Sequence, residues 1–105
     1  MDALFGSKAR TDILVALASL GTSYLSELAQ LLDLRLVEVQ RATASLERTG
    51  AVVTRTMGRT RLVELNPQFW GYSSLCAFLL RMGELPAYAN RFAVRRRPRA
   101  MGKPL

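Results

Sequence analysis

Apolar side chains recur at helical spacing near the start of the chain and predict a helix over residues 8–20. Ser7 stands where an N-cap would accept a backbone hydrogen bond, and Gly21 stands where the helix would end. The stripe that this helix would bury consists of Ile13, Leu14, Leu17 and Leu20.

Two further amphipathic segments follow closely and predict a helix-turn-helix. The first covers residues 24–32 with Ser23 as its N-cap, and Asp33 lies in the turn after it. The second begins at residue 35 or 36 and ends at residue 49, where Gly50 would supply the left-handed C-terminal position.

A β-branched run beginning at Val52 predicts a strand and a short hairpin. Gly58 and Arg59 form a two-residue turn with glycine first, and residues 60–65 form the return strand. Asn66-Pro67 ends this strand. A final helix is predicted over residues 72–82, so the fold class is mainly α with a small β-hairpin.

The second helix of the predicted helix-turn-helix has two distinct faces. At about 100° per residue, the side that must face the core carries Val39, Ala42, Thr43 and Leu46. The opposite side is centred on Val37, Arg41, Ala44 and Arg48, with Gln40 and Ser45 on its flanks. A helix of this kind can lie in the major groove of DNA with its polar face toward the base edges.

The outward side chains suit different parts of a DNA duplex. Arg41 and Gln40 are suited to guanine and adenine edges, and Val37 or Ala44 would touch a thymine methyl group. The residues expected to contact phosphates are Arg35, Ser45 and Arg48. The alternative for each arginine is that it only solvates a surface helix.

The hairpin also carries positive charge. Arg55, Arg59 and Arg61 lie at or near its tip, where a wing would reach a minor groove or the DNA backbone. The alternative is a hairpin kept soluble by charges on its edge strands.

The net charge of +7 is unevenly distributed. Six positive charges and no acid follow residue 85, so the high overall charge belongs to the C-terminal tail. Residues 35–61 hold six arginines against Glu38 and Glu47, which concentrates positive charge on the predicted recognition helix and hairpin. The tail arginines expected to add nucleic-acid contacts are Arg95, Arg96, Arg97 and Arg99.

The composition excludes several function classes. The chain has no histidine and only one cysteine, Cys76, so we expect no intrachain disulfide, no metal site and no cofactor. Nucleophile–base pairs that use these residues are absent, so an enzyme is not expected. No apolar run is long enough to span a membrane, and the expected location is the cytoplasm, associated with the nucleoid.

Three residues match the spacing that recurs in helix-turn-helix units, namely the small residue Ala29, the turn residue Asp33 and the β-branched residue Val39. The string from Tyr24 to Pro67 resembles the winged helix-turn-helix of ArsR- and MarR-type bacterial regulators. The opening LFGSKAR is similar to that of small winged-helix domains found alone or fused to nucleotidyltransferase-like domains. The resemblance covers about residues 4–80 and implies a winged helix that binds DNA.

Two departures from this family pattern are visible. Asp33 occupies a turn position where glycine is common, and aspartate tolerates left-handed geometry better than most residues. The cysteine-containing motif of metal-sensing relatives is replaced by Leu28-Ala29-Gln30-Leu31-Leu32, so a metal-sensing role does not carry over.

The last helix is apolar on nearly every side, which predicts burial on every side. A winged-helix core covers one of these sides, and we expect the other to pack against a second copy of the chain. The expected dimer interface comprises Leu4, Phe5, Trp70, Tyr72, Leu75, Cys76, Phe78, Leu79 and Met82. The alternative is a monomer whose C-terminal segment, including Phe92 and Val94, folds back over this helix. Cys76 would be an ordinary buried residue or, alternatively, a redox-sensing thiol.

These observations predict a winged helix-turn-helix domain over residues 1–85 with a C-terminal dimerisation helix, followed by a basic, flexible tail over residues 86–105 that begins with one or two helical turns. The predicted function is sequence-specific binding of double-stranded DNA by a homodimeric transcriptional repressor. No small-molecule effector is identified. The alternatives are a winged-helix adaptor for a partner such as a nucleotidyltransferase-type protein, and an RNA- or ribosome-associated protein.

Overall fold

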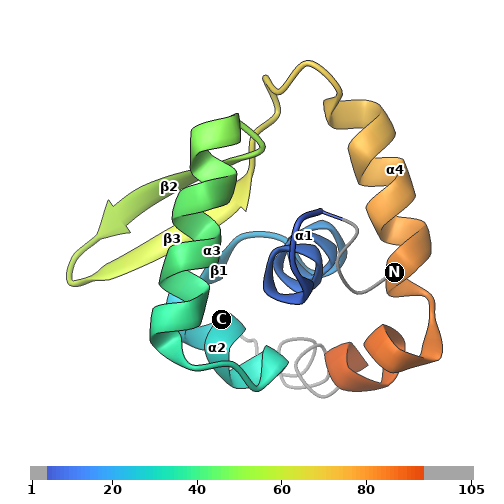
Figure 1. The fold of residues 1–105 in the computed structure, drawn as a ribbon, viewed down its shortest axis with the longest axis horizontal. Helices are drawn as coiled ribbons and strands as arrows, with labels where there is room; N and C mark the ends of the chain where they lie inside the picture. Colours follow the sequence, from blue (N-terminus) through green and yellow to red (C-terminus); the bar gives the residue numbers. More distant parts are fainter. Residues whose placement is uncertain (1–4, 94–105) are drawn as a thin grey trace, which may run out of the picture.

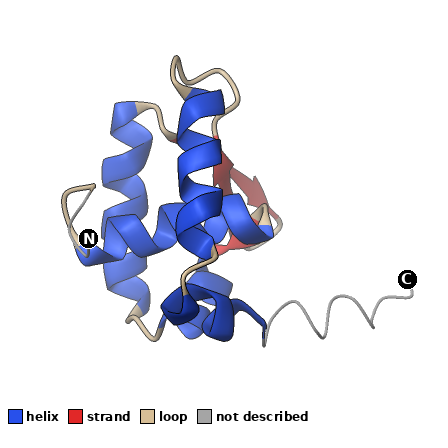
Figure 2. Ribbon diagram, turned by 90° about the vertical axis from the view of Figure 1, so that its right-hand side faces the viewer, coloured by secondary structure: helices blue, strands red, loops and turns tan. Residues whose placement is uncertain are grey.

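The computed structural model describes residues 5–93, which form a group of helices with a small sheet at one side (Figure 1). The elements in chain order are α1 (Lys8–Leu20), β1 (Ser23–Tyr24), α2 (Leu25–Leu32), α3 (Leu36–Thr49), β2 (Val52–Met57), β3 (Thr60–Leu65) and α4 (Tyr72–Gly83). Residues 86–93 are also helical. Figure 2 shows the strands gathered on one side of the helices.

The first helix begins and ends where the sequence predicts. The Ser7 hydroxyl accepts a hydrogen bond from the backbone N–H of Arg10 at 3.1 Å, which satisfies an otherwise unpaired donor of the first turn. Gly21 ends the helix at a φ of 85°. α1 lies at the centre of the molecule, with α3 on one side and α4 on the other (Figure 1).

The helix-turn-helix is confirmed, with a difference at its start. Asp33 has a φ of 56° and so takes the left-handed conformation expected of it in the turn between α2 and α3. The N-cap of α2 is Tyr24 rather than Ser23, and the Glu27 carboxylate accepts from the Tyr24 backbone N–H at 2.9 Å. Glu38 accepts from the backbone N–H of Arg35 in the same way at the start of α3, also at 2.9 Å.

Ser23 takes part in a strand instead of capping a helix. Ser23 and Tyr24 form β1, which pairs antiparallel with β3 opposite Val63 and Leu62. The Ser23 side chain is fully buried, and its hydroxyl donates to the carbonyl of Gly21 at 3.1 Å. The sheet therefore has three strands in the order β1-β3-β2, one more than the sequence predicted.

The predicted hairpin is confirmed, including its turn. β2 and β3 pair antiparallel from Val52 opposite Leu65 to Met57 opposite Thr60, which leaves Gly58 and Arg59 as a two-residue loop. Gly58 has a φ of 64°, a conformation that glycine adopts without steric cost.

The core forms around the central helix. Every residue of α1 from Thr11 to Leu17 is buried. Apolar side chains of the other elements close around it, among them Leu28, Leu32, Val39, Leu46, Val52, Val63, Leu79 and Phe92. Removal of apolar surface from water is the main favourable term in folding, so packing of the other elements around this helix stabilises the domain.

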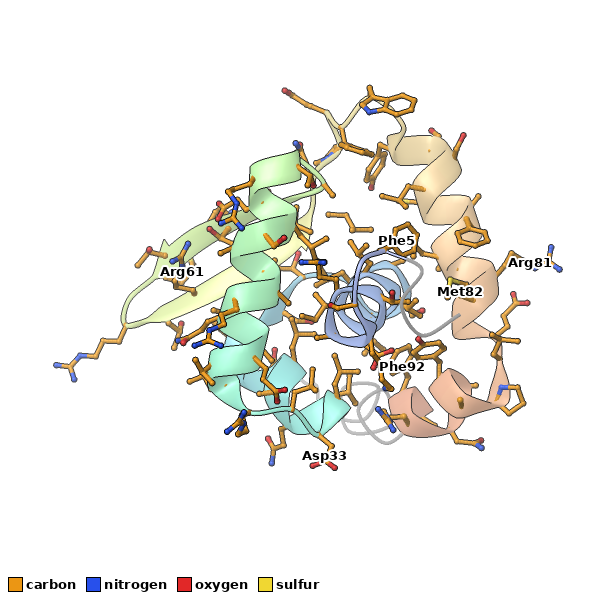
Figure 3. The ribbon with its side chains drawn as sticks, in the orientation of Figure 1. Phe5, Asp33, Arg61, Arg81, Met82 and Phe92 are labelled. Atoms are coloured by element: carbon orange, nitrogen blue, oxygen red, sulfur yellow. The ribbon has the colours of Figure 1, made fainter. Side chains whose placement is uncertain are left out.

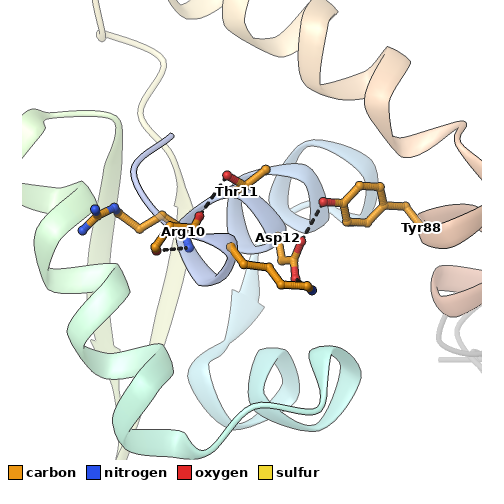
Figure 4. A network of polar contacts seen from close by, with 6 residues as sticks. Arg10, Thr11, Asp12 and Tyr88 are labelled. Carbon is orange, nitrogen blue, oxygen red and sulfur yellow. Dashed lines mark hydrogen bonds and ion pairs between the residues drawn. The ribbon is translucent and has the colours of Figure 1, made fainter. Parts of the chain in front are cut away.

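The C-terminal residues 86–93 belong to the folded unit. Phe92 is fully buried, and its ring lies 5.7 Å from that of Tyr88. The Tyr88 hydroxyl donates to Asp12 Oδ1 at 2.6 Å, and Lys8 Nζ donates to Asp12 Oδ2 at 2.6 Å (Figure 4). The folded part thus continues eight residues beyond residue 85, where the sequence analysis placed the start of the tail. Phe92 is therefore buried in the core, but residues 86–93 do not cover the outer side of α4, where Phe78 stays 45% exposed. Val94 lies outside the described residues.

Candidate nucleic-acid interface

The two faces of α3 are arranged as its periodicity predicts. Its buried residues are Val39, Ala42, Thr43 and Leu46, the four that were expected to face the core. The residues of the predicted outer face that are exposed are Arg35, Val37, Gln40, Arg41, Ala44 and Arg48. The outer face of α3 is therefore open to a ligand and is not covered by any part of residues 5–93.

The arginines of this face differ in how they are held. Within residues 5–93, the side chains of Arg41 and Arg48 make no hydrogen bond or ion pair, so both guanidinium groups are available to a ligand. Arg35 Nε lies 3.8 Å from Glu38 Oε1 in a largely exposed pair. An exposed pair of this kind contributes little to stability and can open when a phosphate competes for the arginine.

Ser45 lies on the flank of α3 that faces α1. Its side chain is half-buried, and its hydroxyl accepts a hydrogen bond from Arg10 Nη1 at 2.9 Å. Arg10 Nε also donates to the carbonyl of Phe5 at 3.1 Å. Figure 4 shows the Arg10 side chain extending from α1 toward α3. No local sequence pattern indicates that Arg10 belongs to this surface, because it lies 35 positions from Ser45.

The opposite flank of α3 faces the hairpin. Arg61 donates to Thr54 Oγ1, and the Thr54 hydroxyl donates to Glu47 Oε2 at 2.9 Å. This chain of hydrogen bonds connects β3 through β2 to α3. Figure 3 shows Arg61 projecting from the hairpin.

The three hairpin arginines do not share one face. The pairing of Thr56 with Arg61 and of Arg55 with Leu62 places Arg55 and Arg61 on opposite faces of the sheet. Arg55 Nε lies 3.9 Å from Glu64 Oε2 on the face away from α3. Arg59 lies in the exposed turn and has no hydrogen-bond or ion-pair partner within residues 5–93.

A surface hollow separates the hairpin from the helix-turn-helix. Its volume is about 270 Å³, and its lining is Tyr24, Leu25, Ser26, Leu36, Gln40, Arg59, Thr60 and Arg61. Leu36 and Val37 are 46% and 42% exposed at the start of α3, so apolar groups stand beside the polar ones. The surface thus combines guanidinium groups, the amide of Gln40 and exposed apolar side chains.

The residues of the predicted dimer interface are partly buried in the core and partly exposed. Leu79 and Met82 are only 0% and 4% exposed because they pack in the core against α1, so they cannot contact a second copy. Trp70 and Phe78 are 92% and 45% exposed. The half-buried members of the predicted set are Phe5, Tyr72, Leu75 and Cys76, whereas Leu4 lies outside the described residues.

An apolar groove runs along this part of the surface. It has a volume of about 670 Å³ and is lined by Phe5, Leu14, Leu46, Thr49, Ala51, Phe69, Trp70, Gly71, Ser74, Leu75 and Phe78. Near it, a hydrogen bond with the Cys76 thiol is the main cause of a raised pKa at Tyr72. Cys76 is a half-buried free cysteine.

Three further predictions concern the tail arginines, metal binding and membrane spans. Arg95, Arg96, Arg97 and Arg99 lie outside the described residues. In the described part, no group of histidine, cysteine, aspartate or glutamate side chains could hold a metal ion. No helix among residues 5–93 has the length and apolar character needed to span a membrane.

Comparison with solved structures identifies the fold. The structure is similar to the crystal structure of the adhesin competence repressor (AdcR) from Streptococcus pyogenes, with a TM-score of 0.60. The chain has a winged-helix fold. The likeness covers 92% of this chain and 68% of that chain at 16% sequence identity, so it concerns the fold. No protein-family model matches the sequence, and no curated protein matches it significantly.

Proposed function

We propose that this winged helix is a transcriptional regulator that binds double-stranded DNA in a sequence-specific way and represses by occluding a promoter. The observation that carries the proposal is the open outer face of α3, where Arg41 and Arg48 have no partner within residues 5–93. An arginine that is exposed, unpaired and flanked by a buried helix face is well placed for contact with a duplex.

The roles of individual residues follow from their positions. Arg41 and Gln40 read base edges in the major groove, and Val37 and Ala44 contact thymine methyl groups. Arg35 and Arg48 contact phosphates beside them. Arg59 at the tip of the hairpin reaches the minor groove or backbone, whereas Arg61 belongs to the chain of hydrogen bonds that holds the hairpin against α3.

We also propose that two copies associate through an aromatic surface formed by Trp70, which lies just before α4, and by Phe78 of α4. Trp70 and Phe78 supply exposed aromatic surface beside the apolar groove, and such surface marks interaction sites in soluble proteins. α3 and α4 lie on opposite sides of α1 (Figure 1), and the groove reaches α3 only at Leu46 and Thr49, so this association leaves the outer face of each recognition helix uncovered. A two-fold dimer would read a palindrome whose half-sites are about one helical turn apart.

Selection of bound duplexes from a random pool is the experiment that tests the proposal. We expect a palindromic consensus, and Arg41→Ala should lose discrimination at one base pair of each half-site, at a cost of about 1–3 kcal/mol. Arg81→Ala is the matched control, because Arg81 is exposed on α4 on the far side of the molecule from α3 (Figure 3). A pool that yields no consensus for the wild-type protein would refute sequence-specific binding.

The contribution of the tail is separable from that of the domain. In the full chain, glutamine at positions 95, 96, 97 and 99 should weaken binding to all duplexes alike and reduce its salt dependence. If that variant lost all binding while Arg41→Ala changed nothing, the tail rather than α3 would carry the interaction.

A second candidate function is supported by the same exposed surface on α4. Trp70 is 92% exposed next to an apolar groove, which also suits an adaptor that docks on another protein. A monomeric chain without a DNA consensus would favour this adaptor function over the regulator.

A further inference from the structure

The neighbourhood of Ser45 contains donors that the fold does not use. The guanidinium of Arg10 has five N–H donors, of which those on Nε and Nη1 bind Phe5 and Ser45 within residues 5–93. Ser45 accepts from Arg10, and its own hydroxyl proton has no acceptor in the described part of the chain. The remaining donors therefore belong to two side chains that a hydrogen bond joins at the flank of α3 that faces α1.

Two more cations border the same point. Arg41 and Arg48 stand four residues before and three residues after Ser45 in α3, the spacings at which helical side chains are neighbours. Both are exposed and unpaired within residues 5–93. We call Arg10, Arg41, Ser45 and Arg48 the Ser45 cluster.

The acidic residues of the adjoining elements are engaged elsewhere. Asp12 pairs with Lys8 and Tyr88 on the other side of α1. Glu38 accepts from the backbone N–H of Arg35, and Glu47 accepts from Thr54 on the hairpin side of α3. The Ser45 cluster thus concentrates three positive charges that no described carboxylate neutralises by an ion pair.

Arg10 is held in place more firmly than a surface arginine. Its guanidinium packs over Gly6, where an added Cβ would lie only 2.2 Å from Nη2. With one hydrogen bond to the segment before α1 and another to α3, its position is fixed before any ligand arrives. A fixed cation loses less conformational entropy on binding than a free one, which favours contact with an anion.

We propose that the Ser45 cluster binds one backbone phosphate of the DNA, with Arg10 and Ser45 as its donors and Arg41 and Arg48 on either side. This assignment rests on the proposed function and adds Arg10 of α1 to the interface. A phosphate fits because the cluster lies on the flank of α3, beside the face that reads the bases. Contacts to phosphates fix the register of a protein on its duplex without reading the sequence.

The salt dependence of DNA affinity distinguishes this role from a purely structural one. For the duplex selected from a random pool, Arg10→Gln should lower the slope of log affinity against log salt by about one per protomer. The loss of affinity should be the same for the selected duplex and for a scrambled one. Arg10→Lys keeps the charge and should keep the slope, and Arg81→Gln, with its side chain on α4, is the control for loss of a remote charge.

Single-phosphate replacement covers the case in which Arg10→Gln fails to fold. With neutral methylphosphonates placed one at a time in the selected duplex, wild-type protein should lose affinity at one phosphate in each half-site. Ser45→Ala should reduce that loss, because the alanine removes one of the two donors to the same phosphate. The assignment would be overturned if Ser45→Ala behaved as wild type at every position of the methylphosphonate scan. For a folded Arg10→Gln, a salt slope as steep as that of Arg10→Lys and of wild type would also overturn it. Consensus selection by the wild-type protein would still stand in that case, so failure here is distinct from failure of the proposed function.

Discussion

Arg10 and Asp12 are two residues apart in α1, and their side chains leave the helix on nearly opposite sides (Figure 4). Two residues correspond to about 200° around a helix, so Arg10 reaches α3 while Asp12 reaches Tyr88 in residues 86–93. The Asp12 side chain is only 2% exposed, and each of its oxygens has a hydrogen-bond donor. A buried carboxylate requires such partners because its desolvation is costly.

At the residue scale, removal of the Tyr88 hydroxyl should destabilise the domain. Tyr88→Phe leaves Asp12 Oδ1 buried without its donor, and we expect the free energy of unfolding to fall by about 1–3 kcal/mol. Chemical denaturation measures this change. Tyr24→Phe is the matched control, since Tyr24 is a 37% exposed tyrosine at the start of α2, away from Asp12. A loss from Tyr88→Phe no larger than that from Tyr24→Phe would show that the Asp12 contact does not stabilise the fold.

At the element scale, the helices that bury a full stripe of apolar residues were predictable from periodicity. α1 begins at Lys8 and ends at Leu20, as expected, and the faces of α3 follow from its sequence alone. β1 was not predictable because two residues, Ser23 and Tyr24, are too few to show an alternating pattern. Its existence depends on pairing with β3, which lies about forty residues later in the chain.

The candidate site was predictable where its geometry is local and was missed where it is not. Arg41 and Arg48 face outward because the helix period places them opposite the core. The contact between Arg10 and Ser45 joins residues that are 35 positions apart, and no local signal reports it. The burial of Leu79 and Met82 in one chain similarly depends on how α4 meets α1, which an all-round apolar pattern does not specify.

The residue that ends α3, Gly50, can be used to test whether its backbone conformation alone requires glycine. Gly50 has a φ of 89°, and a Cβ added there would meet only Phe69 at an ordinary 3.9 Å. Gly50→Ala should therefore lower the free energy of unfolding by about 1–2 kcal/mol, because alanine is strained in the left-handed conformation. The added Cβ has room, so no steric clash should add to this loss. Gly71→Ala is the control, since Gly71 has a φ of −105° and a similar distance to Phe69, 3.7 Å. Thermal unfolding of both variants measures the difference, and a Gly71→Ala loss as large as that of Gly50→Ala would contradict this account.

At the scale of the whole molecule, the two candidate surfaces are on different sides of the central helix. The outer face of α3 is polar and positively charged, whereas the exposed part of α4 is aromatic and apolar. The two surfaces approach each other only at the apolar groove, whose lining includes Leu46 and Thr49 of α3, so substitutions at the outer side of α4 should leave the outer face of α3 intact.

Dimer formation can accordingly be tested without DNA. Trp70→Ala should weaken self-association about tenfold or more, because large aromatic side chains dominate the energy of interfaces. Met57→Ala is the control, since Met57 is a 51% exposed apolar residue on the hairpin. Sedimentation over a range of protein concentrations gives the association constant. A wild-type chain that stays monomeric throughout that range would exclude the dimer.

The tight closure of the hairpin limits how its length can change. Arg61 and Thr54 meet α3 because alternate residues of each strand point to the same side. Inserting one residue into each strand between these residues and the core would turn Arg61 to the far side and bring its neighbours inward. Two added residues per strand would restore the original sides. In relatives or designed variants with a longer wing, each strand should therefore be longer by an even number of residues.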